Sequence, residues 1–101
     1  MKKIINCKLY DTDTARELAT YTPHPYSSNF DYYVETLYIK RTGEYFLHGE
    51  GGPMSIYAEH ISGCYAWGEK IVPLTNDMAK AWAETHVTAD EYIEIFGGVE
   101  E

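Results

Sequence analysis

Thr36-Leu-Tyr-Ile-Lys-Arg-Thr-Gly-Glu-Tyr-Phe-Leu-His-Gly49 is the stretch that decides the fold of this 101-residue chain. Apolar and polar side chains alternate in both of its halves, as in two antiparallel strands that each bury one face. Gly43 lies in the short connection between the halves, where a hairpin loop needs the positive φ that only glycine adopts at little cost. The stretch therefore predicts a β-hairpin at the centre of a small antiparallel sheet, which must be covered on one face.

Further strands are expected on both sides of this hairpin. Residues 3–10 predict a second hairpin around Asn6 and Cys7, with either a tight turn that strains Cys7 or a bulged, wider loop. Residues 31–40 are rich in β formers and extend the first central strand backwards, with its early half near an edge or on an exposed face. Residues 71–74 predict a short strand whose proline places it at a sheet edge or near a strand end.

Glycine and proline mark the expected loops. Residues 22–29 contain two prolines, and residues 49–53 have three glycines in four positions before a proline, which breaks the preceding strand. Residues 63–68 predict a loop or an irregular hairpin tip with exposed aromatic side chains. Residues 54–61 fit a short strand and a single helical turn equally well.

Helix signals are strongest near the C-terminus. Thr75 can cap a helix over residues 76–84, in which a stripe at i, i+4 spacing predicts the lid on the sheet: Met78, Ala79, Trp82 and Ala83. Residues 88–91 form a capping box that opens a second short helix, and the glycine pair 97–98 ends it.

A further helix of about two turns is expected over residues 15–20, because residues 11–14 offer N-cap side chains. With these elements the chain predicts one α+β domain over residues 1–101. A C-terminal helix packs an antiparallel sheet of four to five strands, and short additional helices complete the fold.

Charge is distributed unevenly along the chain, whose formal net charge is −8. Residues 1–50 hold seven acidic and six basic residues, whereas residues 51–101 hold nine acidic residues and two lysines. Such a field repels nucleic acid and anionic membranes and favours a basic protein partner. We expect a carboxylate array that imitates a nucleic-acid backbone, a DNA mimic, formed by Glu84, Asp90, Glu91 and Glu94. A solvated helix face is the competing interpretation.

A different partner-binding surface is predicted at Tyr65 and Trp67, if the acidic residues serve only solubility. This alternative describes a non-enzymatic accessory or regulatory module that binds through exposed rings.

Catalytic and metal-binding signals are weak. His60 and Cys64 have a compact spacing, but a structural zinc site normally needs a second close pair, and an acidic setting does not activate a thiol. Acid–base chemistry could use Glu35, Glu44 or Glu50 beside a histidine, but no pair is marked by the sequence. We therefore predict no enzyme activity, no catalytic residue, no metal ligand and no cofactor.

The two cysteines give no disulfide framework, and reduced thiols in the cytoplasm are expected. Near the N-terminus, polar residues follow after only two apolar positions, which is not the pattern of a signal peptide. No apolar run approaches the ~20 residues of a membrane-spanning helix.

The chain also resembles a family of small, uncharacterised proteins that are common in phages and mobile elements of Gram-positive bacteria. The resemblance lies in Ile4-Ile5-Asn6-x-Lys8-x-Tyr10-Asp11-Thr12-x-Thr14-Ala15, Leu37-Tyr38, Thr42-Gly43-Glu44-Tyr45-Phe46, Gly49-Glu50-Gly51-Gly52-Pro53 and Ile71-Val72-Pro73-Leu74-Thr75. The family pattern has glycine after Asn6, where this chain has Cys7.

Small acidic proteins of this setting include anti-CRISPR and other anti-defence inhibitors. The resemblance therefore implies a stoichiometric inhibitor that blocks a basic nucleic-acid-binding groove, such as that of a CRISPR effector in the host cytoplasm. It carries over no catalytic residue.

Overall fold

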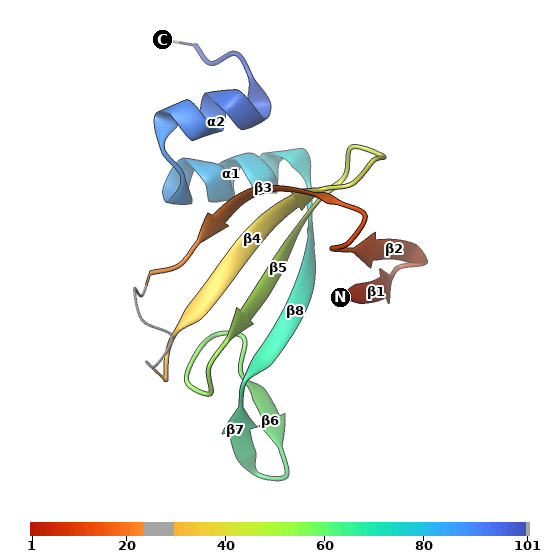
Figure 1. Ribbon diagram of the computed structural model, residues 1–101, viewed down its shortest axis with the longest axis vertical. Helices are drawn as coiled ribbons and strands as arrows, with labels where there is room; N and C mark the ends of the chain where they lie inside the picture. The colour runs from red at the N-terminus through yellow and green to blue at the C-terminus, as the bar shows by residue number, and fades with distance from the viewer. Residues whose placement is uncertain (24–29, 101) are drawn as a thin grey trace.

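The computed structural model describes residues 1–23 and 30–100 (Figure 1). In this part of the chain the elements are β1 (Lys2–Ile5), β2 (Lys8–Asp11), β3 (Arg16–Tyr21), β4 (Tyr33–Ile39), β5 (Tyr45–Gly51), β6 (Glu59–Ile61), β7 (Cys64–Ala66), β8 (Gly68–Leu74), α1 (Asn76–His86) and α2 (Ala89–Phe96). Four strands form an antiparallel sheet in the order β3-β4-β5-β8, while β1–β2 and β6–β7 form separate two-stranded sheets. The predicted α+β class is confirmed.

The central hairpin is formed by β4 and β5, as the sequence predicts. Leu37 pairs with Leu47 in its register. Gly43 has a φ of 90°, and its N–H donates a hydrogen bond of 2.9 Å to the carbonyl of Lys40. The glycine thus supplies the conformation that closes the turn.

Each face of the four-stranded sheet has its own cover. On one face α1 buries Leu37 and Leu47 against Ala79, Trp82 and Ala83. On the opposite face, the β1–β2 hairpin covers part of the surface through a second buried cluster, formed by Tyr10, Phe46 and Ile71. Alternation along β5 explains this arrangement, since successive side chains point to opposite faces.

The β1–β2 hairpin has a tight two-residue turn, so the bulged or wider loop is wrong. Ile5 pairs with Lys8, and the intervening Asn6 and Cys7 have φ values of 51° and 64°. This is the left-handed region, which is costly for a non-glycine residue such as Cys7. The β6–β7 hairpin, around residues 62–63, likewise replaces the irregular tip expected there.

The helix predicted over residues 15–20 is wrong, because this segment is strand β3 at a sheet edge. Pairing with β4 supplies its hydrogen bonds, and Ala19 is buried against α1. Tertiary pairing therefore overrides the helix propensity of the segment. Asp11 does not cap a helix: its carboxylate accepts a hydrogen bond of 2.9 Å from the N–H of Asp13, which forms a turn.

Two predictions near the central strands are also corrected. Residues 49–53 do not break the strand at Gly49, because β5 continues to Gly51. A Cβ at Gly49 would overlap the ring of Tyr57, so glycine is needed there to admit that ring onto the sheet. The early half of β4 is not at an edge: β4 is a central strand, and Glu35 is buried.

Two further segments complete the comparison of the fold with the sequence. Residues 54–61 contain turns followed by the short strand β6, so the single helical turn is not formed. Of the expected loop 22–29, residues 24–29 lie outside the described residues.

Both C-terminal helices begin as predicted. The Thr75 hydroxyl accepts a hydrogen bond of 3.1 Å from the N–H of Met78, and Thr88 forms the capping box with Glu91. Helix α1 extends to His86, two residues beyond the prediction. Met78 was expected in the buried stripe but is 49% exposed. It lies about 100° around the helix from the fully buried Ala79, at the margin of the packed face.

Candidate functional site: an acidic groove between β3 and α2

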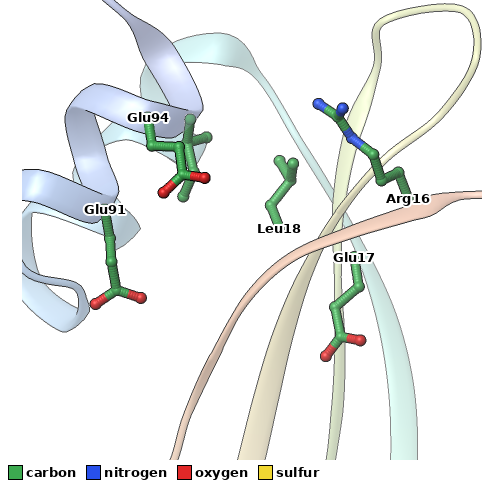
Figure 2. Close-up of a pocket in the computed structure, with 6 residues that line it drawn as sticks. Arg16, Glu17, Leu18, Glu91 and Glu94 are labelled. Atoms are coloured by element: carbon green, nitrogen blue, oxygen red, sulfur yellow. The ribbon is translucent and has the colours of Figure 1, made fainter.

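A groove lies between edge strand β3 and helix α2 (Figure 2). It has a volume of about 280 Å³ and is lined by Arg16, Glu17, Leu18, Glu91, Glu94 and Ile95. The carboxylate of Glu17 turns to the opposite face of the sheet, where it accepts a hydrogen bond of 2.9 Å from the hydroxyl of Thr20. The two carboxylates of α2 and the guanidinium of Arg16 leave the groove with a negative net charge. The groove therefore joins side chains from two segments that are distant in the sequence.

The β3 side of the groove is shaped by a bulge. Its register with β4 shifts between Glu17 and Ala19, and both Leu18 and Ala19 pack toward the core under α1. Figure 2 shows Leu18 pointing from the strand toward α2, with Arg16 and Glu17 leaving the strand in opposite directions. Because Ile95 also packs against the core, the groove has an apolar floor and a charged rim.

Glu91 has a structural role in addition to its place in the groove. Its carboxylate accepts hydrogen bonds of 3.2 Å from the N–H and 3.0 Å from the hydroxyl of Thr88, which completes the capping box. A negative charge in the first helical turn is also favoured by the macrodipole. Glu94 makes no such capping contact and is therefore the better position at which to test the charge of the groove.

The predicted acidic residues are all exposed, and they extend beyond the groove. Within residues 1–23 and 30–100, the ion pairs engage Glu44 and Glu69, and none engages the four predicted acids. We call the following set the acidic surface: Glu84, Asp90, Glu91 and Glu94. The lysines of β1 do not neutralise it, since the β1–β2 hairpin packs on the sheet face opposite α1.

A second, more apolar groove lies between the two helices. Its volume is about 310 Å³, and it is lined by Ala83, Glu84, Val87, Thr88, Ala89, Tyr92, Ile93 and Val99. Ile93 and Val99 are exposed. Glu84 stands on its rim, so apolar and acidic groups adjoin each other on this side of the helices.

The predicted aromatic residues lie elsewhere. Tyr65 belongs to β7 and is 68% exposed, and Trp67, which follows that strand, is 46% exposed. Trp67 stacks on Tyr32 with 6.0 Å between ring centroids. Figure 1 shows the β6–β7 hairpin at the opposite end of the molecule from α2. The structure therefore does not combine the two predicted sets in one surface, and we call Tyr65 and Trp67 the aromatic end.

The pair His60 and Cys64 gains no further ligand. In the register of β6 with β7, His60 faces Tyr65, and their ring centroids are 5.1 Å apart. Among the residues that the structure describes, neither His60 nor Cys64 belongs to a group of three close metal-ligating side chains; the group that is found consists of His48, Glu50 and Glu69. The sequence alone does not show that His48 and Glu50 lie beside Glu69, because this depends on the pairing of β5 with β8.

Sequence reasoning also missed the environment of Glu35, which lies buried beneath α1. One carboxylate oxygen accepts a hydrogen bond of 2.9 Å from the indole N–H of Trp82, and the other accepts one from the hydroxyl of Tyr57. Burial and this bond raise the pKa of Tyr57 above its ordinary value. Burial also raises the pKa of nearby Tyr33. Since both oxygens are occupied by protein donors, this network serves the fold.

No family model, curated protein or solved structure matches the chain. The resemblance to small phage and mobile-element proteins thus stays a prediction. Among the described residues, no helix has the length and apolar character needed to cross a membrane.

Proposed function

We propose that the protein is a binding-only inhibitor whose acidic surface occupies the basic nucleic-acid-binding groove of a bacterial defence nuclease, in the manner of an anti-CRISPR protein. The observation that carries this proposal is the array of exposed carboxylates along α1 and α2, of which Glu91 and Glu94 line the groove beside β3. The charge of these carboxylates is not neutralised by lysine or arginine ion pairs within the described residues.

Physical chemistry supports a basic partner for this surface. Exposed carboxylates on two neighbouring helices produce a local negative potential that speeds encounter with a positive groove. The apolar side chains beside them, Ile93 and Val99, can add contact area that charge alone does not provide. A phosphate backbone would be repelled, so the protein would compete with nucleic acid rather than bind it.

The test uses purified protein against a panel of guide-loaded CRISPR effector nucleases, with DNA cleavage and direct binding as readouts. We expect the protein to inhibit a subset of these nucleases stoichiometrically. Its binding to them should weaken steeply at high salt, because exposed charges are screened within ~10 Å at ~0.1 M. The double variant Glu84→Lys/Glu94→Lys should abolish inhibition. Glu91 is left intact because it caps α2.

A matched charge reversal serves as the control. Glu59 is exposed on β6, at the aromatic end. Glu59→Lys should leave inhibition unchanged if the acidic surface is the binding site. Inhibition that is insensitive to salt and to Glu84→Lys/Glu94→Lys would contradict the proposed mechanism.

The second candidate function is an accessory or regulatory module that binds through the aromatic end. It is favoured by the exposure of large apolar side chains there, since Ile61 is exposed beside Tyr65 and Trp67. In this case Tyr65→Ala would abolish binding to the partner, while the charge reversals on α1 and α2 would have little effect.

A further inference from the structure

Three potential metal ligands meet on the sheet face that α1 leaves uncovered. His48 and Glu50 are two positions apart on β5 and therefore point to the same face. They share this face with Phe46, which the β1–β2 hairpin covers. Glu69 on β8 is the direct cross-strand partner of Glu50. Neighbouring strands thus hold all three side chains.

The pairing of Glu50 with Glu69 is unfavourable without a cation. Like charges directly opposite each other on antiparallel strands destabilise a sheet. Within the described residues, no lysine or arginine forms an ion pair with either carboxylate. The group that does approach is His48, whose Nε2 lies 3.1 Å from a carboxylate oxygen of Glu69. A cation at this point would remove the repulsion.

The distances suit a metal ion. The ligand atoms of His48, Glu50 and Glu69 all lie within 4.8 Å of one another. Ligands bound to zinc at ~2.0–2.1 Å in a tetrahedron are ~3.3 Å apart, close to the separation of 3.1 Å between His48 and Glu69.

The surroundings keep the histidine in place but leave the site open. His48 has Thr36 and Ile71 as its cross-strand neighbours on β4 and β8, and its side chain is only 17% exposed. The Glu69 side chain is 46% exposed, so an ion could enter from solvent. One imidazole and two carboxylates are ligands that zinc and similar divalent ions accept.

We propose that His48, Glu50 and Glu69 bind a divalent transition-metal ion of the zinc type, with at least one coordination position left to water or to a partner's side chain. Three protein ligands with an open position are the arrangement of reactive rather than purely structural zinc sites. The site is separate from the acidic surface, so it does not depend on the proposed inhibitory function.

The test is a calorimetric titration of the metal-free, full-length protein with Zn²⁺ at constant pH, supported by the absorption spectrum of the Co²⁺ form. We expect one ion per chain. The single variants His48→Ala, Glu50→Gln and Glu69→Gln should each lose at least about tenfold in affinity, since even outer-shell changes cost that much at metal sites. The matched controls His60→Ala and Glu59→Gln, on the β6–β7 hairpin, should retain the affinity of the parent protein.

A second measurement keeps the proposal independent of folding defects in the variants. Without metal, Glu50→Gln should raise the melting temperature, because it removes the cross-strand repulsion. Zn²⁺ should raise the melting temperature of the parent protein more than that of Glu50→Gln. Absence of stoichiometric binding, or equal affinity in the parent and in His48→Ala, would overturn the proposal; the latter result would mean adventitious coordination, for example by the exposed Cys7 and Cys64.

Discussion

The indole N–H of Trp82 donates a hydrogen bond of 2.9 Å to the carboxylate of Glu35, and both side chains are buried. This bond joins helix α1 to the central strand β4. The second carboxylate oxygen accepts a hydrogen bond from the hydroxyl of Tyr57, which belongs to the segment between β5 and β6. A buried carboxylate is tolerated in a core when donors of this kind replace water. Helix, sheet and connecting segment are therefore held at one point.

Trp82→Phe should destabilise the protein, because it removes one of the two donors to Glu35. We expect a loss of about 1–3 kcal/mol from the broken hydrogen bond to a carboxylate, with an additional loss from the smaller ring. Urea denaturation followed by circular dichroism measures the effect. Trp67→Phe is the matched control: Trp67 is 46% exposed, and phenylalanine keeps a ring that can stack on Tyr32, so the free energy of unfolding should change by less than about 0.5 kcal/mol.

Tyr57 should make the protein sensitive to alkali. Its pKa is raised in the folded state, above all by burial and next by the hydrogen bond to Glu35. The unfolded chain therefore releases the phenolic proton first, so the contribution of Tyr57 is complete below pH ~10 and declines as the pH rises further. Denaturation curves at increasing pH should show this decline in the parent protein. A decline of the same size in Tyr57→Phe would contradict the assignment.

Gly49→Ala should be destabilising by about 1–3 kcal/mol, because its Cβ would overlap the ring of Tyr57. The double variant Gly49→Ala/Tyr57→Ala should show strong non-additivity, since removal of the ring removes the overlap. Measured free energies for the two single variants and the double variant complete this cycle. Additive losses would show that Gly49 acts through backbone freedom alone.

The carboxylate of Glu44 should titrate unusually low. Hydrogen bonds from Lys8, and then from Thr42 and Lys40, lower its pKa to about 2 from an ordinary value of 4.5. Its stabilising contribution is therefore present above pH 4.5 and is lost as the pH falls toward 2. Carboxyl resonances in an NMR titration report this pKa directly.

Lys8→Met should raise the pKa of Glu44 toward its ordinary value, because Lys8 is the largest contributor to the shift. High salt should act in the same direction, since the pair is exposed and screened. Lys80→Met, on the exposed surface of α1, should leave the pKa of Glu44 unchanged. A pKa of Glu44 that does not respond to Lys8→Met would show that the ion pair does not persist in solution.

The parts of the fold that sequence could predict are those that depend on neighbouring residues. Gly43 marks its turn by backbone conformation alone, and Thr88 with Glu91 forms a capping box within one helical turn. Strand β3 could not be found this way: its residues favour a helix, and only pairing with β4 makes them a strand. The same error hid the groove beside α2, since Arg16 and Leu18 form its other side only because they lie on that strand.

The sites were predicted only in part for a related reason. The exposure of Glu84 and Glu94 follows from helix periodicity and charge, so the sequence was sufficient to place them on the surface. The partners of Glu35 and Glu69 depend on sheet register and helix docking, which bring together residues far apart in the chain. Period-2 patterns do not specify which strands are neighbours.

The separation of the acidic surface from the aromatic end has a mechanical consequence. The molecule measures 48 × 34 × 20 Å, and α2 and the β6–β7 hairpin stand at opposite ends of its longest axis (Figure 1). The protein could therefore bind one macromolecule at the acidic surface and another at the aromatic end without a collision between them, and it would then act as a rigid spacer. A protein built in this way raises the effective concentration of one bound molecule near the other, and it gains avidity when both belong to the same assembly.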